Sequence, residues 1–245
     1  MIWFYLVVYM EDGKKMSNLK ILYEDNHIIV VVKPFNVLSQ GDNTGDSSIM
    51  DMIKDYIKIK YNKPGNVYLG LVHRLDRPVG GIMVFARTSK AASRLSRDFN
   101  DHSIDKKYLA IVKGKVSDSG EFIDKIDRNK NGNSFISENG KYAKLNYKLV
   151  EYDKKNDCSL VAIKLETGRH HQIRVQFSSR GHYLLGDQRY GVQDNKQICL
   201  FSYYLSFTHP VTKEKMEFFD LPPEISYWTF FTLSKNVSII KHLHL

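Results

Sequence analysis

A charged loop runs directly into an apolar strand at Val72-His73-Arg74-Leu75-Asp76-Arg77-Pro78-Val79-Gly80-Gly81-Ile82-Met83-Val84-Phe85-Ala86. The apolar run at 82–86 predicts a buried strand. In the loop before it, the carboxylate of Asp76 lies between Arg74 and Arg77. Flanking guanidiniums favour the ionised carboxylate and offer fork-shaped donors to phosphate. A nucleophile or base that acts on a polyanion needs both properties, although a surface ion-pair cluster would give the same pattern.

The composition is that of a basic protein with room for a core. The chain has 245 residues, of which 42% are hydrophobic, enough for one large domain or two small lobes. A net charge of +9 indicates RNA, DNA or an anionic membrane surface as a partner, although a merely basic protein would share it. The two cysteines, Cys158 and Cys199, lie far apart, which argues against a disulfide framework and a zinc cluster. They fit a reducing compartment, so we expect a cytoplasmic protein.

The first ten residues are apolar but reach only about half the length of a membrane span. They lack a basic leader and are followed by Glu11 and Asp12, which makes them a poor signal peptide. We therefore predict an N-terminal extension at 1–18, with an added edge strand as the alternative for its first part. No membrane partner is expected.

Apolar runs and alternating patterns predict more strands than helices. Strands are predicted at 28–32, 82–86, 108–112, 143–149 and 161–165. Helices are predicted at about 48–61, with Ser48 as the N-cap, and at about 89–99. Residues 127–141, rich in Asn, Lys and Gly, are predicted to form a mobile loop between strands. The fold class indicated is α+β, with a mixed, mostly antiparallel β-sheet core and flanking helices.

The helix predicted at 89–99 carries a basic stripe opposite its apolar one. Lys90, Arg94 and Arg97 fall on this stripe at spacings of four and three. Three cations on one face repel each other mildly unless an anion lies along them. The stripe therefore predicts a track for phosphates, and a solvated helix face fits the pattern equally well.

A second cluster of hydrogen-bond donors follows the strand at 161–165. Thr167-Gly168 predicts a turn, after which the chain continues as a strand or a helical turn. The donors displayed there are Arg169, His171, Gln172 and Arg174. The adjacent histidines lack a cysteine or carboxylate partner nearby, so a zinc site is disfavoured and no metal is expected. The turn-rich segment at 181–191 is predicted to pack behind this cluster.

Several common catalytic motifs do not occur in the sequence. It has no phosphate-binding glycine loop, no dinucleotide fingerprint, no nucleophile elbow and no zincin motif. Their absence disfavours NTPases, Rossmann dehydrogenases, α/β-hydrolases and zincins. A single carboxylate without a second acid also disfavours ordinary glycosidase chemistry. A DNA-binding protein is disfavoured because no helix-turn-helix or finger signature is present.

Taken together and in order, the motifs resemble those of the RluA family of pseudouridine synthases. The segment 72–88 resembles the family signature, and 23–34 resembles its opening strand motif. Lys107-Tyr108-Leu109-Ala110 resembles its tyrosine motif, and 167–174 resembles its arginine motif. Residues 186–191 and 205–210 resemble the closing segments of the family. Departures occur at Val79-Gly80-Gly81, Tyr183 and Phe201, and they bear on subgroup and substrate.

The resemblance implies a pseudouridine synthase fold with a central RNA-binding cleft. It implies an isomerase that converts specific uridines of structured rRNA or tRNA to pseudouridine, with base flipping and without a cofactor. The catalytic domain would span 19–235, followed by a C-terminal tail at 236–245. Because only residues 1–22 precede the first motif, we expect the family's S4 domain to be absent, and we expect a monomer.

The resemblance also assigns roles to residues. Asp76 would be the catalytic carboxylate, acting by covalent attack or by assisting elimination. Arg174 would pair with Asp76, and Tyr108 would pack on the target base and help to remove the C5 proton. Arg74 would fill the vacated stack or clamp a phosphate. The RNA-contact candidates are His73, Arg74, Arg77, Lys90, Arg94, Arg97, Arg169, His171 and Gln172. His73, His171 and Gln172 fit a loop-holding role equally well, and a non-catalytic RNA-binding module is the rival function.

Overall fold

The computed structural model describes residues 19–242, which fall into two units. The first unit comprises the described residues up to Ile104 together with Tyr204–Asp220. The second comprises Asp105–Tyr203 and the described residues from Leu221 onward. Strand β10 (Leu200–Thr208) begins in the second unit and ends in the first. The predicted extension at 1–18 lies outside the described residues.

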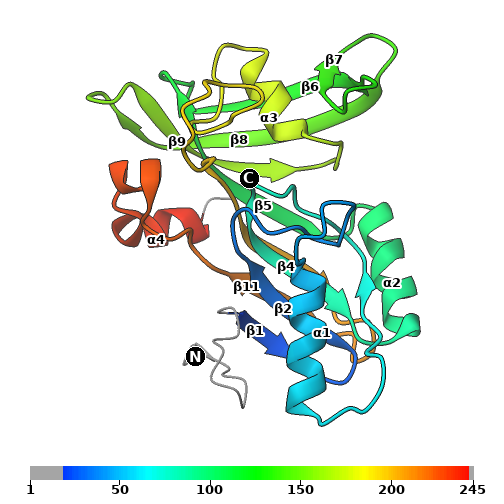
Figure 1. The fold of residues 1–245 in the computed structure, drawn as a ribbon. Helices are drawn as coiled ribbons and strands as arrows, with labels where there is room; N and C mark the ends of the chain where they lie inside the picture. The colour runs from blue at the N-terminus through cyan, green and yellow to red at the C-terminus, as the bar shows by residue number, and fades with distance from the viewer. Residues whose placement is uncertain (1–18, 243–245) are drawn as a thin grey trace. The chain divides into compact units, whose positions relative to one another are not determined.

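The sheet of the first unit is centred on its two most apolar strands, β2 (Ile28–Lys33) and β4 (Gly80–Ala86). They pair antiparallel from Ile28 opposite Ala86 to Lys33 opposite Gly81, and every residue of β4 is buried. The other strands are β1 (Lys20–Glu24), β3 (Gly70–Leu71), the end of β10 and β11 (Lys215–Phe219). Their order is β1-β2-β4-β10-β11, with β3 beside β4. Figure 1 labels β1, β2, β4 and β11 of this sheet. The strands predicted at 28–32 and 82–86 are confirmed.

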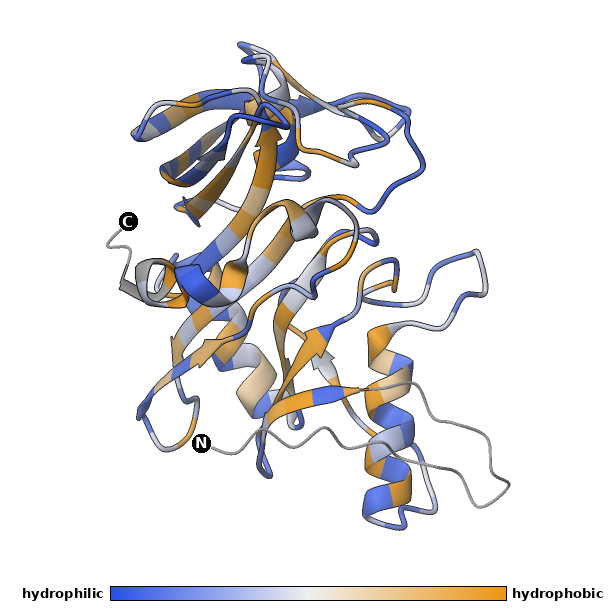
Figure 2. Ribbon diagram, turned by 90° about the vertical axis from the view of Figure 1, so that its left-hand side faces the viewer, coloured by the Kyte–Doolittle hydropathy of each residue, from blue (hydrophilic) through white to orange (hydrophobic). Residues whose placement is uncertain are grey.

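Helix α1 (Ile49–Lys60) begins at the predicted N-cap. The Ser48 hydroxyl accepts a hydrogen bond from the backbone N–H of Asp51, whose carboxylate accepts from the N–H of Ser48. This capping box satisfies two donors that would otherwise lack partners at the helix start. The buried side of α1 consists of Ile49, Ile53, Tyr56 and Ile57. Hydrophobic and hydrophilic residues therefore alternate along the helix, as the hydropathy colours of Figure 2 show.

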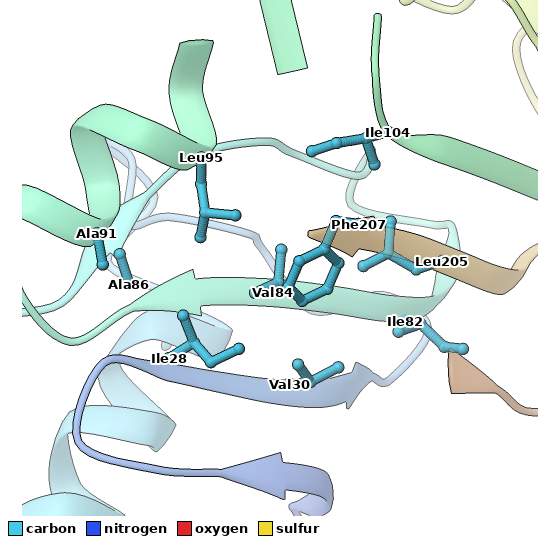
Figure 3. Packing of buried hydrophobic residues seen from close by; sticks show 10 residues of the cluster. All are labelled: Ile28, Val30, Ile82, Val84, Ala86, Ala91, Leu95, Ile104, Leu205 and Phe207. Atoms are coloured by element: carbon cyan, nitrogen blue, oxygen red, sulfur yellow. The ribbon is translucent and has the colours of Figure 1, made fainter. Parts of the chain in front are cut away.

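Helix α2 (Ser89–Asn100) packs against the strands of the first unit. Its N-cap is Thr88, and its buried residues Ala91 and Leu95 join a cluster with β2, β4 and β10. Figure 3 shows this cluster, in which Leu95 lies near Val84 and Phe207. Each large apolar side chain buried in this way contributes roughly 1.5–3 kcal/mol. The cluster therefore fixes the strand that follows the Asp76 loop.

The second unit contains a longer antiparallel sheet. Its strands are β5 (Asp105–Lys113), β6 (Ser119–Arg128), β7 (Ser134–Ile136), β8 (Lys141–Asp153) and β9 (Cys158–Leu165). The order is β10-β5-β9-β8-β6-β7, with β5/β9, β9/β8, β8/β6 and β6/β7 paired antiparallel. The predictions at 108–112, 143–149 and 161–165 are confirmed. The remaining elements are α3 (Gln172–Ser178), the 3-10 helix η1 (Ser226–Phe230) and α4 (Leu233–His242).

One face of this second sheet is covered by α3. Directly opposed residues of antiparallel strands share a face, which places Phe122 with Leu145 and Tyr147 with Ile163. The rings of Phe122 and Tyr147 lie 4.9 and 5.5 Å from the ring of Phe177 in α3. We call this side the α3 face.

One predicted loop differs from the structure. The predicted loop at 127–141 contains strand β7, whose Ser134 is buried, so the prediction of an unbroken loop was wrong. The strand is too short to give a periodic pattern, and the Asn- and Gly-rich turns around it dominate the composition. Helix α4 runs across the boundary predicted at 235. Within residues 19–242, no helix is long and apolar enough to cross a membrane.

Candidate active site

The Asp76 loop of the first unit is tied to the chain by one serine. The Ser39 hydroxyl donates to the Leu75 carbonyl at 2.7 Å and accepts from the Leu75 N–H at 3.1 Å. Ser39 is buried, so both bonds are shielded from water. The carbonyl of Asp76 accepts a bond from the N–H of Val79 at 3.0 Å, which closes the turn. The backbone on both sides of the half-buried carboxylate is therefore fixed.

A buried lysine lies beneath the same loop. Lys33 is fully buried, and its ammonium donates to the carbonyls of Pro34, Val37 and Arg77 at 3.0, 2.6 and 3.1 Å. Burial lowers the pKa of Lys33 to about 7, the negative charge of Asp76 opposes that shift, and the charge of Arg77 adds to it. Lys33 thus links β2 to the loop, and the charge of Asp76 affects the pKa of Lys33.

The residues around Asp76 divide into exposed and anchored ones. Arg74 is exposed, and Arg77 makes a solvent-exposed ion pair with Asp46 at 2.6 Å. His73 accepts a hydrogen bond from the Val84 N–H at 3.1 Å and stacks on Phe99 at 4.4 Å. These contacts give His73 a loop-holding role and leave Arg74 and Arg77 at the surface.

The basic stripe on α2 is only partly directed to solvent. Arg94 donates to the Pro210 carbonyl at 2.6 Å, so it joins α2 to the turn after β10. Lys90 is exposed, and Arg97 is 67% exposed beside Asp98. The phosphate track predicted here therefore retains two surface cations, while the third also has a structural contact.

In the second unit, Tyr108 and the arginine motif share the α3 face. Tyr108 lies opposite Ile163, which belongs to that face, and its side chain is buried. The arginine motif ends in α3, so the helical alternative left open by its sequence is the correct one. Arg174 therefore projects from the helix that covers the face carrying Tyr108.

Arg174 is buried and held by Asp187. Its Nε and Nη2 donate to the two carboxylate oxygens at 2.8 and 2.6 Å, and its guanidinium lies 5.1 Å from the centre of the Tyr190 ring. Burial alone would raise the pKa of Asp187, but the hydrogen bonds and charge of Arg174 outweigh burial and hold it below its usual value. The backbone N–H groups of Arg189 and Tyr190 also donate to this carboxylate.

The loop before α3 is held by Gln172. This buried side chain accepts from the Thr167 hydroxyl at 2.8 Å and the Arg169 N–H at 3.0 Å, and donates to the Lys144 carbonyl at 3.0 Å. His171 has a left-handed φ of 54° and bonds through Nδ1 to the Tyr190 hydroxyl at 2.8 Å. Both side chains therefore act as loop holders.

Arg169 anchors to β8 through Nε, which donates to the Tyr142 carbonyl at 2.8 Å. Arg169 is only half-buried, so part of its side chain is accessible to solvent. Across residues 19–242, no group of three or more His, Cys, Asp or Glu side chains is arranged to hold a metal ion.

Three residues that hold the candidate site residues in place were not predicted from the sequence. Lys33 and Ser39 contact the Asp76 loop across long stretches of chain, and Asp187 contacts Arg174 from a turn-rich segment. The sequence signal for Lys33 was a charged residue closing an otherwise apolar strand, and for Asp187 an acid in the turn after the arginine motif. Asp76 belongs to the first unit and Tyr108 and Arg174 to the second, so the predicted pairing of Asp76 with Arg174 stays a prediction.

The α+β fold and the two motifs define a class of RNA-modifying enzyme, and comparison with known proteins identifies the family. The family model described as RNA pseudouridylate synthase matches residues 27–179. A protein of Zymomonas mobilis named ribosomal large subunit pseudouridine synthase D is 33% identical over 82% of this chain and 68% of its own length. The chain therefore belongs to the RNA pseudouridylate synthase family, and it is an RNA pseudouridine synthase, an isomerase.

Other relatives agree with this assignment. A protein of Aquifex aeolicus named as an RNA pseudouridine synthase is 33% identical over 84% of this chain and 70% of its own length. The solved structure of human RNA Pseudouridylate Synthase Domain Containing 1 has a TM-score of 0.73 and 25% identity, covering 95% of this chain and 98% of that one. The predicted fold class is confirmed.

Proposed function

We propose that Asp76 is the catalytic carboxylate of this synthase. The observation that carries the proposal is the double hydrogen bond between Ser39 and Leu75, reinforced by Lys33, which fixes the backbone beside a half-buried acid. Catalytic groups need this kind of fixed placement, because small displacements from the reacting geometry are costly in rate. A surface ion-pair cluster would need no buried tether beneath it.

The reaction is an isomerisation with balanced atoms and no net redox change. The N1–C1′ bond of uridine breaks, the base turns, and a C5–C1′ bond forms. The proton on C5 is then lost and N1 becomes protonated. An ionised carboxylate serves either course, by forming a transient bond to the ribose or base or by removing a proton from the sugar. Both courses require the target nucleotide to leave its stack, which costs a few kcal/mol.

Tyr108 and Arg174 complete the proposed machinery from the second unit. Tyr108 offers a ring for the target base and a hydroxyl near the C5 proton. Arg174 would pair with the carboxylate of Asp76 and orient it. Their shared location on the α3 face of one sheet supports a common role.

The RNA contacts are proposed for the cations that lie at the surface. These are Arg74, Arg77, Lys90, Arg97 and Arg169. Arg94 would contribute through its position on the same helix. Relatives are named for the ribosomal large subunit, which supports rRNA as the substrate, with tRNA as the alternative. The cysteines Cys158 and Cys199 are both unbridged, which supports a cytoplasmic location.

The test replaces the acid by its neutral isostere. Asp76→Asn should reduce tritium release from C5-labelled uridine in bulk RNA at least about hundredfold while RNA affinity stays near the parental value. Asp55→Asn, an exposed acid on α1, is the matched control and should keep full activity. Turnover of Asp76→Asn within about tenfold of the parent would contradict the role. A parent enzyme that binds RNA but releases no tritium would favour the non-catalytic module.

A further inference from the structure

Strand β5 carries a lysine on the α3 face next to Tyr108. Lys106 and Tyr108 are two residues apart, and alternate residues of a strand point to the same side of a sheet. Tyr108 lies opposite Ile163 of β9, which places both residues on the α3 face. The adjacent Lys107 lies opposite Lys164 and points to the other side. Of the two neighbouring lysines, Lys106 is therefore the one that shares a face with the residue proposed to hold the target base.

The ammonium of Lys106 lies at the turn that opens the arginine motif. A side-chain Cβ placed on Gly168 would have the Nζ of Lys106 as its nearest neighbour, at 3.9 Å. Gly168 directly precedes Arg169, and the motif continues into α3, which carries Arg174. The side chain of Lys106 therefore extends from the strand of Tyr108 to the arginine motif, and its charge lies where these two segments of the proposed site meet.

Lys106 is withdrawn from bulk water to a degree that is unusual for a lysine. The residue is half-buried, and burial lowers the pKa of its ammonium, while the charge of the adjacent Asp105 opposes that shift. A cation in a partly dehydrated site acts more strongly on a nearby charge than the same cation in water does. A lysine that only contacts the RNA backbone needs no such withdrawal, so the burial of Lys106 favours an action on the base.

The reaction creates a negative charge on the base that a cation can stabilise. When the N1–C1′ bond breaks, its electron pair goes to N1 and spreads onto the carbonyl oxygens O2 and O4. The charge is lost again when C5 supplies the electron pair of the C5–C1′ bond. A donor at one of these oxygens lowers the barrier because it binds the detached base more tightly than the uridine. Two residues along a strand span about 6.6 Å, so a base packed on Tyr108 lies within reach of the Lys106 side chain.

We propose that Lys106 is a catalytic residue of the isomerisation, which donates a hydrogen bond to a carbonyl oxygen of the flipped uracil and stabilises its negative charge while the base is detached. The ammonium keeps its proton throughout, so the step needs no added acid or base. The assignment rests on the proposed role of Tyr108 as the residue that holds the base. Arg174, a second cation of this face, is engaged by both carboxylate oxygens of Asp187.

The test measures single-turnover tritium release from C5-labelled bulk RNA at saturating enzyme, together with RNA affinity. Lys106→Met removes the charge and keeps most of the apolar stem, and it should lower the release rate about hundredfold with little change in affinity. Lys106→Arg retains a cation and should recover the rate to within about tenfold of the parent. The matched control is Lys107→Met, which removes the same charge from the other side of β5 and should keep the parental rate.

Each alternative role of Lys106 predicts a different result. Parental release in Lys106→Met would overturn the proposal, and if Asp76→Asn is inactive in the same assay, the proposed catalytic acid would still stand. Weaker RNA binding with a parental rate at saturation would make Lys106 a phosphate contact instead. Equal losses in Lys106→Met and Lys106→Arg would show that the charge is not what matters. Urea unfolding of each variant confirms that the compared proteins are folded.

A second variant guards the test against a loss of folding in Lys106→Met. Lys106→Gln also removes the charge but keeps a polar group at the half-buried position. It should be as slow as Lys106→Met in tritium release, because a neutral amide does not stabilise the anionic base as an ammonium does. A Lys106→Gln enzyme that works at the parental rate would also overturn the proposal.

Discussion

Arg174 and Asp187 form a two-point ion pair inside the second unit, with both carboxylate oxygens engaged by one guanidinium at 2.8 and 2.6 Å. The side chains are 6% and 0% exposed. Asp187 also accepts from two backbone N–H groups of the turn that follows it. The pair therefore fixes the orientation of Arg174 and joins α3 to the 187–190 turn.

Removing one member of this pair should be costly. Asp187→Ala leaves a buried guanidinium without its main counter-charge, and we expect a loss of about 3–5 kcal/mol in the free energy of unfolding. Arg174→Met/Asp187→Leu replaces both charges by apolar groups and should recover most of that loss without restoring tritium release. Urea unfolding measures the stabilities of both variants.

The exposed pair Lys215–Glu217 supplies the control for this prediction. Its side chains are 73% and 51% exposed, so Glu217→Ala should change the free energy of unfolding by less than about 1 kcal/mol. Equal losses in Asp187→Ala and Glu217→Ala would show that the buried pair has no special structural role.

Lys33 should give the enzyme a stability that rises with pH above neutrality. Its folded-state pKa is lowered to about 7 by burial, below the value of the unfolded chain. Between about pH 7 and 10.5 the unfolded chain therefore binds the proton more tightly, and deprotonation favours the folded state. The free energy of unfolding should rise by up to about 1.4 kcal/mol per pH unit in this window. Below pH 7 Lys33 is protonated in both states, so its contribution should not change with pH.

A lysine labelled with ¹³C at Cε makes this measurable by NMR. The Lys33 signal should titrate near pH 7, and its disappearance in Lys33→Met assigns it. In Asp76→Asn the opposing negative charge is absent, so the pKa of Lys33 should fall below its parental value. An unchanged midpoint in that variant would mean that the two side chains do not interact.

The strands and helices with strong local patterns were predictable from the sequence. β2 and β4 follow from their apolar runs, and α1 begins at Ser48 because Ser and Asp three residues apart form a capping box. Strand β6 was not predicted, because the exposed Ile123 interrupts its alternation of buried and polar residues.

The contacts that support the candidate site could not be predicted in the same way. Ser39 meets Leu75 and Lys33 meets the Arg77 carbonyl through tertiary folding of β2 and the loop, and no local pattern encodes such a meeting. The loop-holding roles of His73 and Gln172 likewise depend on partners elsewhere in the chain, Val84 and Lys144. Residue type identified the chemistry of the motifs, and the fold decided which of their side chains are anchored.

Ser39→Ala should separate placement of the Asp76 loop from RNA binding. The variant leaves the buried N–H and carbonyl of Leu75 without their shared partner, which should lower the free energy of unfolding by about 1–3 kcal/mol. Because the loop loses its tether, tritium release should fall while RNA affinity stays at the parental value. Ser47→Ala, at an exposed position of the same unit, should leave both unchanged. If Ser39→Ala isomerises uridine at the parental rate, the hydrogen bonds between Ser39 and Leu75 do not position Asp76. They would then give no support to the catalytic role proposed for Asp76.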